Sequence, residues 1–278
     1  MATDKSSSSP PAGSQEPVAL VLEDVCKRFG DVDVLRGVSF RVRRGETLCI
    51  LGGSGGGKTT LLKILIGALR PTSGKVVIGG EDIASLDEQE LDRVRRKLGV
   101  MFQSGALFNS MSIAENLALP LQYHTKLDAD TISTMVKIKL QQVDLLHAAD
   151  RKPGEISGGM KKRAAVARAL ALDPRILFYD EPSAGLDPIA TSRIDRLINQ
   201  LKTSMQMTNV VVTHVMESVR RIADRVVMLH RGEVLLDGSL DDLLSSEEPL
   251  VRQFVRGDLE GLAVGSTPLA RYHKDLLM

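Results

Sequence analysis

Residues 52–60 form the first group in the chain whose types and spacing point to a chemistry. They read Gly-Gly-Ser-Gly-Gly-Gly-Lys-Thr-Thr and fit the pattern G-x-x-x-x-G-K-[ST] of a phosphate-binding loop. Glycines let successive backbone N–H groups converge on phosphate oxygens, the lysine adds a full charge, and the first threonine hydroxyl can coordinate Mg²⁺. We therefore predict a nucleotide site that consists of Gly52, Gly53, Ser54, Gly55, Gly56, Gly57, Lys58, Thr59 and Thr60.

The context of this loop separates a phosphate site from an ordinary glycine-rich turn. The run at residues 46–51 is mostly apolar and predicts a buried parallel strand, and apolar residues at helical spacing follow the loop from Leu61 to Leu69. Strand, loop and helix in this order are what the motif requires, because the helix N-terminus then faces the phosphates. The context favours the nucleotide site.

Two adjacent carboxylates follow a second buried run. Residues 176–179 are apolar or aromatic, and Asp180 and Glu181 come at the carboxyl end of the strand predicted there, which is where parallel sheets bind ligands. We expect Asp180 to act on Mg²⁺ and Glu181 to accept a proton from the water that attacks the γ-phosphate. The alternative is a pair of solvated turn acids, whose mutual repulsion is costly unless a cation lies nearby.

Two further polar residues end predicted strands. Gln103 follows the run at 98–102, and its amide could ligate the metal or hold a water, although a single glutamine in a loop means little. His214 follows the buried run at 209–213. A lone histidine is usually structural or exposed, but this position at the end of a core strand favours contact with phosphate or with the attacking water.

The stretch Ser157-Gly158-Gly159 precedes a helix that we predict from Lys161 to Leu172. Its serine can cap that helix, and its glycines leave the first N–H groups open to an anion. On local physics alone, a plain helix cap is the better interpretation. Phe29 lies a little over twenty residues before the phosphate loop and is either a core aromatic or a ring that stacks on adenine.

The elements that must position these residues alternate between strand and helix. Strands at 18–22 and 34–42, around a turn at Gly30-Asp31, suit an antiparallel sheet with one solvated face. Helical patterns dominate between about Ser104 and Leu172, where Ser112 and Glu115 form a capping box and apolar spacing predicts a helix from residue 128 to about 146. We therefore predict an α/β core with an inserted helical subdomain.

The composition narrows the classes of protein that fit. The chain has 278 residues, 43% of them hydrophobic, and a net charge of +1, so it lacks the basic surplus of a nucleic-acid-binding protein. Its two isolated cysteines make a disulfide improbable and favour the cytosol. No apolar run reaches the roughly eighteen residues of a membrane span. Residues 1–17 are rich in Ser, Pro and Gly and lack the apolar segment of a secretory signal, so we predict a disordered tail. A transit peptide would be rich in Arg and poor in acidic residues, and this stretch is neither.

The ordered set of motifs resembles that of ABC-transporter ATPase subunits. It comprises residues 52–60, Gln103, Ser157-Gly158-Gly159, Asp180-Glu181, 183–187 and His214, and the resemblance covers about Val18 to Ser245. Because six spaced motifs in one order are far more specific than any one, they overturn the helix-cap interpretation of Ser157. The resemblance implies a P-loop NTPase (RecA-like) core with an N-terminal antiparallel β-subdomain and a helical subdomain at about 104–172. It also implies a head-to-tail dimer in which each site joins the loop of one chain to the signature, Ser157-Gly158-Gly159, of the other.

ATP and Mg²⁺ are the cofactors that this resemblance implies. Glu181, His214 and Lys58 would be catalytic: the glutamate polarises the attacking water, while the histidine and the lysine hold the γ-phosphate. The remaining implied positions are Phe29 against adenine, the loop 52–60 on the phosphates, Thr59, Gln103 and, through water, Asp180 on the metal, and Ser157, Gly158 and Gly159 from the second chain.

A closer resemblance is carried by Phe102 to Phe108 and by Met160, which replaces the glutamine that most of the family has. Both features resemble the corresponding sequences of ATPases of Mla and Mce-type importers, which move phospholipids or other hydrophobic molecules between bacterial membranes. This similarity implies an integral-membrane permease, a lipid-binding MCE-domain protein, and a location at the cytoplasmic face of the inner membrane. The permease would contact the groove around Ser104 to Leu121, where Glu115 lies.

Other members of this class remain as alternatives. An importer subunit for amino acids, metal ions or other small solutes is opposed only by residues 104–108 and Met160. A chromosome-maintenance or repair ATPase would need a very long coiled coil between loop and signature, and a translation factor of this type would carry two motif sets. Residues 246–278 predict an extension with one helix at 249–255 and a flexible end, either packed on its own chain or clasping a second subunit.

Overall fold

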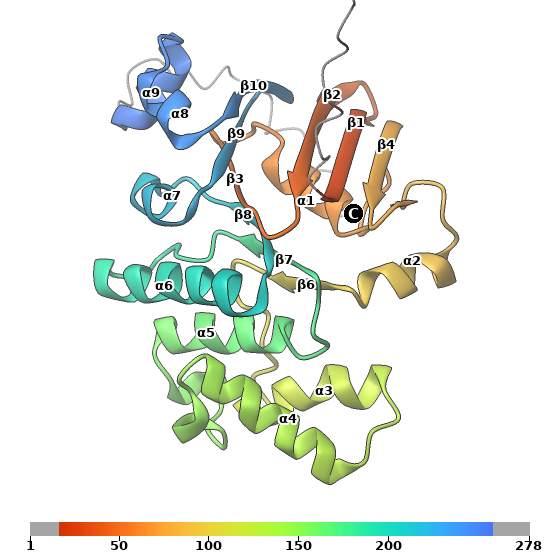
Figure 1. Ribbon diagram of the computed structural model, residues 1–278, viewed down its shortest axis with the longest axis vertical. Helices are drawn as coiled ribbons and strands as arrows, with labels where there is room; N and C mark the ends of the chain where they lie inside the picture. Colours follow the sequence, from red (N-terminus) through yellow and green to blue (C-terminus); the bar gives the residue numbers. More distant parts are fainter. Residues whose placement is uncertain (1–16, 258–278) are drawn as a thin grey trace, which may run out of the picture.

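The computed structural model describes residues 17–257, so the expected tail at 1–17 and the expected flexible end lie almost wholly outside the described residues. Two sheets stand side by side, with a group of helices below them in Figure 1. Within the described range, none of the helices combines the length and apolarity that a membrane crossing demands.

The first sheet is antiparallel and contains the N-terminal strands. Its order is β2-β1-β4-β5, with bounds β1 (Val18–Phe29), β2 (Val32–Arg43), β4 (Ser73–Ile78) and β5 (Glu81–Asp82). The first strand is seven residues longer than the predicted 18–22. The register shifts between Leu22 and Val25, where Asp24 has a φ of 48°, and this bulge interrupts the alternation of apolar residues on which the prediction relied.

The second sheet carries the glycine loop and the acidic pair at one edge. Its order is β10-β9-β3-β8-β7-β6, with parallel pairing except between β9 and β10. The bounds are β3 (Thr47–Gly52), β6 (Leu98–Met101), β7 (Ile176–Asp180), β8 (Thr208–Val212), β9 (Arg225–His230) and β10 (Glu233–Gly238). Every residue of β3 and β8 is buried, as expected for parallel strands that are covered on both faces.

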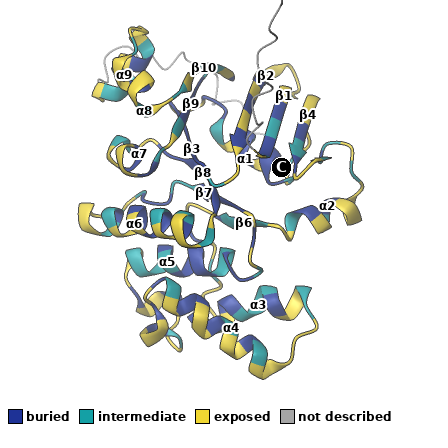
Figure 2. Cartoon of the chain, viewed as in Figure 1, coloured by how far each residue is buried: buried dark blue, intermediate teal, exposed yellow. Residues whose placement is uncertain are grey.

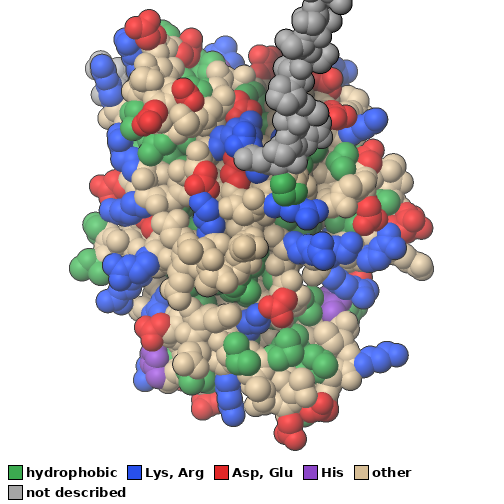
Figure 3. All heavy atoms as spheres, viewed as in Figure 1, with side chains coloured by type: hydrophobic (Ala, Val, Ile, Leu, Met, Phe, Trp, Pro, Cys, Tyr) green, Lys and Arg blue, Asp and Glu red, His purple; other side chains and the backbone are tan. Residues whose placement is uncertain are grey.

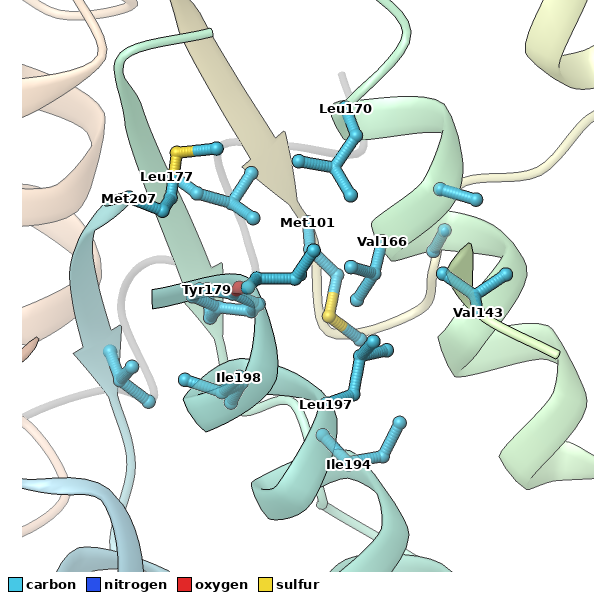
Figure 4. Packing of buried hydrophobic residues seen from close by; sticks show 14 of the residues in the cluster. Met101, Val143, Val166, Leu170, Leu177, Tyr179, Ile194, Leu197, Ile198 and Met207 are labelled. Atoms are coloured by element: carbon cyan, nitrogen blue, oxygen red, sulfur yellow. The ribbon is translucent and has the colours of Figure 1, made fainter. Parts of the chain in front are cut away.

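Two separate hydrophobic cores explain why these strands are apolar throughout. Leu48 and Ile50 of β3 belong to one core, together with the first sheet and α1 (Lys58–Leu65), whereas Cys49 and Leu51 face the other core. That second core contains the helices drawn below the sheet, and burial is deepest along the sheet between the two (Figure 2). Figure 4 shows how Met101 and Tyr179 pack there against Val166, Leu197 and Ile198.

Helices fill the segment between β6 and β7, as predicted. They are α3 (Ile113–His124), α4 (Ala129–Gln142), two short 3-10 turns at Leu146–Ala148 and Pro153–Glu155, and α5 (Gly158–Ala169). The predicted end of α4 near residue 146 is wrong, because Asp144 adopts a left-handed φ of 55° and Arg163 donates to the Val143 carbonyl at 2.6 Å. Helix α5 begins three residues earlier than predicted, since Ser157 accepts a bond from the N–H of Met160 at 3.3 Å and so caps it.

The remaining helices surround the second sheet. They are α2 (Glu88–Arg95), α6 (Pro188–Met205), α7 (Met216–Ile222), α8 (Leu240–Ser245) and α9 (Pro249–Arg256). Helix α9 confirms the predicted C-terminal helix, and its Val251 is fully buried in the same core as Leu243 of α8. Side chains of both charge signs are interspersed over the face shown in Figure 3.

Candidate active site

The glycine loop connects β3 to α1, as its sequence context predicted. The strand ends at Gly52, and Gly57 is the N-cap residue of α1 with a φ of 96°. A Cβ at Gly52 would lie 2.3 Å from the Leu229 carbonyl oxygen, and a Cβ at Gly57 would lie 2.7 Å from the side chain of Leu35. Both positions also have a positive φ, so only glycine fits this path without displacing its neighbours.

Lys58 lies across this loop. Its ammonium donates to the carbonyl oxygens of Gly52 at 2.8 Å and Gly53 at 2.9 Å. Burial lowers the pKa of the ammonium, while the charges of Glu181 and Asp180 act in the opposite direction. The predicted phosphate ligand and the predicted acidic pair therefore belong to one electrostatic site.

Parallel pairing brings the ends of four strands to one edge of the sheet. Ile50 of β3 lies opposite Val212 of β8, which lies opposite Asp180 of β7, and Met101 of β6 lies opposite Tyr179. The glycine loop, the acidic pair and the segments that lead to Gln103 and His214 all begin at this edge. This is the arrangement that the carboxyl ends of parallel strands were expected to produce.

Glu181 and His214 contact each other directly. The Oε1 atom of Glu181 is 2.9 Å from the Nδ1 atom of His214, whereas its Oε2 atom is buried and has no partner among the described residues. The Glu181 backbone has a φ of 47°, and its N–H donates to the Val212 carbonyl at 2.9 Å. The carboxylate is thus held on one oxygen and free on the other, which suits a group that must accept a proton.

Lys162 is a functional candidate that the sequence reasoning missed. Its side chain is buried in α5, and its ammonium donates to the carbonyl of Glu181 at 3.2 Å and to the carbonyl of Gln103. Burial and the charge of Glu181 raise the pKa of Asp180, and the charges of Lys162 and Lys58 oppose this rise. The acidic pair therefore has the neighbouring cations that its repulsion demands. Helical spacing is the sequence pattern that could have indicated Lys162, because position 162 lies on the same apolar helix face as residues 165 and 166.

Gln103 lies two residues beyond β6 and is exposed, so its amide is accessible at the site edge. Phe29 ends β1 in the other sheet and leaves 41% of its surface exposed, with the Lys27 ammonium 5.0 Å from the ring centroid. An exposed aromatic at a strand end is available for stacking. Its interpretation as a core aromatic is wrong, because burial does not account for this ring.

The signature stretch does not lie against the glycine loop of its own chain. A Cβ at Gly158 would have the Leu186 side chain as its nearest neighbour at 3.6 Å, and one at Gly159 would have that of Ala190 at 3.3 Å. Both neighbours belong to the start of α6 and the turn before it. Ser157 and Gly158 are exposed at the N-terminus of α5, where N–H groups can bind an anion.

A glycine loop between a parallel strand and a helix, next to an acidic pair at the same sheet edge, defines a P-loop nucleoside triphosphatase. The family model described as ABC transporter matches residues 35–184. The chain therefore belongs to the ABC transporter family, and it is the ATP-hydrolysing subunit of a transporter; the resemblance seen in the sequence is confirmed.

Individual relatives agree with this assignment. The chain is 40% identical to the intermembrane phospholipid transport system ATP-binding protein MlaF of Haemophilus influenzae over 89% of this chain and 94% of that protein. It is 43% identical to the probable ribonucleotide transport ATP-binding protein mkl of Mycobacterium leprae over 86% of this chain and 69% of that protein. A dimeric, post-hydrolysis structure of the cassette MJ0796 bound to ADP and Pi matches with 33% identity and a TM-score of 0.73 over 80% of this chain and 98% of that one.

Proposed function

We propose that this chain drives the transport of phospholipid, or of another hydrophobic substrate, across or between bacterial membranes. The observation that carries the proposal is the similarity to MlaF over nearly the full length of both chains. The stretch from Phe102 to Phe108 and Met160 in the signature, which resemble the same class, support it. The mkl relatives favour a second candidate, a transporter of ribonucleotides.

We further propose that the working unit is a head-to-tail dimer seated on an integral-membrane permease, with an MCE-domain protein in the complex, at the cytoplasmic face of the inner membrane. The dimeric neighbour MJ0796 supports the pairing of two cassettes. In our proposal the ABC domain spans 18–245, with its helical subdomain at about 104–172 and a C-terminal extension at 246–278.

For the site, the proposal places ATP on the loop 52–60 with adenine against Phe29. The donor set for Mg²⁺ is Thr59, Gln103 and Asp180, which fits this ion because Mg²⁺ takes oxygen ligands and binds few protein groups besides phosphates and water. Thr59 is exposed at the start of α1 and Asp180 ends β7 at the same sheet edge. When bound, the ion neutralises charge on the phosphate oxygens.

Contacts in the structure support the roles that we propose for the remaining residues. The free Oε2 of Glu181 accepts the proton of the attacking water, and the bond from Oε1 to His214 fixes the orientation of the carboxylate. Lys58 and the loop N–H groups hold the phosphates, and Ser157 and Gly159 of the second chain close the site. The positioned groups carry nearly all of the catalysis in phosphoryl transfer.

The deciding experiment is purification of the chain from native membranes with its associated proteins, followed by ATPase assays in nanodiscs. A multi-span permease that co-purifies with a lipid-binding protein, together with phospholipid-dependent hydrolysis, is the expected result. If the rate of hydrolysis changes with added ribonucleotide and does not change with phospholipid, the second candidate is correct and this proposal is wrong.

A further inference from the structure

Lys162 is a buried ammonium whose bonds go to backbone carbonyls. Only 8% of its surface is exposed, and its Nζ atom donates to the carbonyl oxygens of Glu181 and Gln103. Burial lowers its pKa, and the charges of Asp180 and Glu181 oppose that shift. A buried cation is costly unless its donors are satisfied, so these bonds hold the ammonium at one defined place.

The two carbonyls belong to segments that leave neighbouring strands. Strands β6 and β7 are paired in parallel; Gln103 lies two residues beyond the end of β6, and Glu181 directly follows the last residue of β7. The left-handed backbone of Glu181, with a φ of 47°, is strained and persists only where the surroundings hold it. Its N–H is held by Val212 and its C=O by Lys162, so both ends of the residue are fixed.

Helix α5, which carries Lys162, is held firmly by its packing and by a second side chain. Val166, one turn further along, packs into the same core as Met101 of β6 (Figure 4). Arg168, on the same helix, donates to the carbonyls of Gly105 at 3.2 Å and Ala106 at 2.7 Å. The side chains of Lys162 and Arg168 in helix α5 therefore both bind the loop after β6. Lys162 also binds the backbone directly after β7.

We propose that Lys162 is a positioning residue for hydrolysis: it fixes the backbone of Glu181 relative to the Gln103 loop, so that the free carboxylate oxygen faces the attacking water. The inference rests on the proposed roles of Glu181 and Gln103. The inference gives helix α5 a contact with Glu181, the proposed general base of its own chain. This contact is in addition to the one that the helix N-terminus is proposed to make with the second chain.

The test compares steady-state ATP hydrolysis by the full chain and by variants of it. Lys162→Met keeps the length of the side chain and removes the donors, and we expect kcat to fall about tenfold or more, because small misplacements of catalytic groups are that costly. KM for ATP should stay within about threefold, since the base acts in the transition state. Lys162→Arg restores a buried cation with several donors and should recover kcat to within about threefold of the parent.

The matched control is Lys139→Met. Lys139 is also a helical lysine, 5% exposed, but it pairs with Asp173 at the far end of α5 from the signature. This variant should lower the melting temperature while leaving kcat unchanged. Should Lys162→Met not fold, Lys162→Gln, with a shorter and neutral amide, takes its place and should lower kcat at least about threefold.

Unchanged kcat in the Lys162 variant, a rise in KM without a fall in kcat, or an equal loss of kcat in Lys139→Met would overturn the inference. Glu181→Gln, assayed in parallel, separates it from the proposed site. If Glu181→Gln loses hydrolysis and Lys162→Met does not, only the positioning role is wrong. If Glu181→Gln hydrolyses ATP at the parental rate, the assignment of the base is wrong as well.

Discussion

The contact between Glu181 and His214 is the residue-scale feature on which the proposed chemistry depends. The two side chains come from successive strand ends and meet at 2.9 Å, which leaves the buried Oε2 atom of Glu181 without a partner in the described part of the chain. Neither side chain could do this alone, because an unrestrained carboxylate would present either oxygen at variable angles. The pair therefore acts as one unit.

Glu181→Gln should bind ATP with parental affinity and hydrolyse it about a hundredfold more slowly, because one central group of a phosphoryl-transfer site commonly contributes that much. The closed dimer should then accumulate with ATP bound. Equilibrium nucleotide binding and size-exclusion chromatography measure the two effects.

His214→Ala should lower kcat by a similar factor of about a hundred, with little change in ATP affinity, since it removes the group that orients the carboxylate. The matched control is His147→Ala, which changes an exposed histidine in the 3-10 turn Leu146–Ala148. Equal losses in both variants would mean that the contact at 2.9 Å has no catalytic role.

Several of these residues were predictable because their signals are local. The glycine loop, the buried runs and the acids at their ends lie within short windows of sequence, and strand ends in a parallel sheet meet at one edge. The partners of Lys162 were not predictable, because they depend on β6 and β7 being neighbours although more than seventy residues separate them. The contact of Glu181 with His214 depends on tertiary pairing in the same way.

At the scale of elements, the glycine loop is held by its surroundings as much as by its own sequence. Gly57→Ala would place a methyl group 2.7 Å from the Leu35 side chain, in a backbone conformation that alanine rarely adopts. We expect a loss of about 1–3 kcal/mol of stability together with weakened ATP binding. Thermal melting with and without ATP measures both. Gly154→Ala, at a position with open space and no positive φ, should change neither.

Glu115 of helix α3 lies in the proposed permease groove and also takes part in the capping box of its own helix. Charge reversal at Glu115 should weaken binding to the permease, but the Oε2 atom of Glu115 also accepts a bond from the N–H of Ser112 at 2.6 Å and completes the predicted capping box. Glu115→Lys therefore also removes a cap, at a cost of about 1 kcal/mol. Glu115→Gln keeps an acceptor for that bond and removes the charge.

If the charge itself contacts the permease, both Glu115 variants should weaken co-purification with the membrane protein, and only the lysine variant should melt earlier. Loss of co-purification in the lysine variant alone would assign the effect to the cap of α3. Pull-down from detergent extracts and thermal melting of the same preparations distinguish the two results.

At the scale of the whole molecule, the proposed head-to-tail dimer means that a single chain would hold only half of a working site. A chain with Lys58→Ala and a chain with Gly158→Glu should each be nearly inactive, because one lacks the phosphate ligand and the other presents a repelling carboxylate. The glutamate fits locally, since Leu186 lies 3.6 Å from the Cβ position and an acid suits a helix N-terminus. Mixing the two chains should restore activity, because the mixed dimer contains one intact loop facing one intact signature.

A mixture that stays as inactive as its components would contradict the head-to-tail arrangement. Restoration should also grow with total protein concentration until dimers dominate. Mixing Lys58→Ala with Glu181→Gln, both on the loop side of the site, serves as the control and should restore little, because every mixed site then carries one of the two defects.

The half-exposed ring of Phe29 has an optical consequence. The chain contains no tryptophan, so its intrinsic emission comes from tyrosine, and Tyr179 is enclosed in the core. Phe29→Trp would create the sole indole of the molecule at the place where adenine is proposed to stack. Its emission would then follow nucleotide arrival and departure in real time, without a label and without a turnover assay.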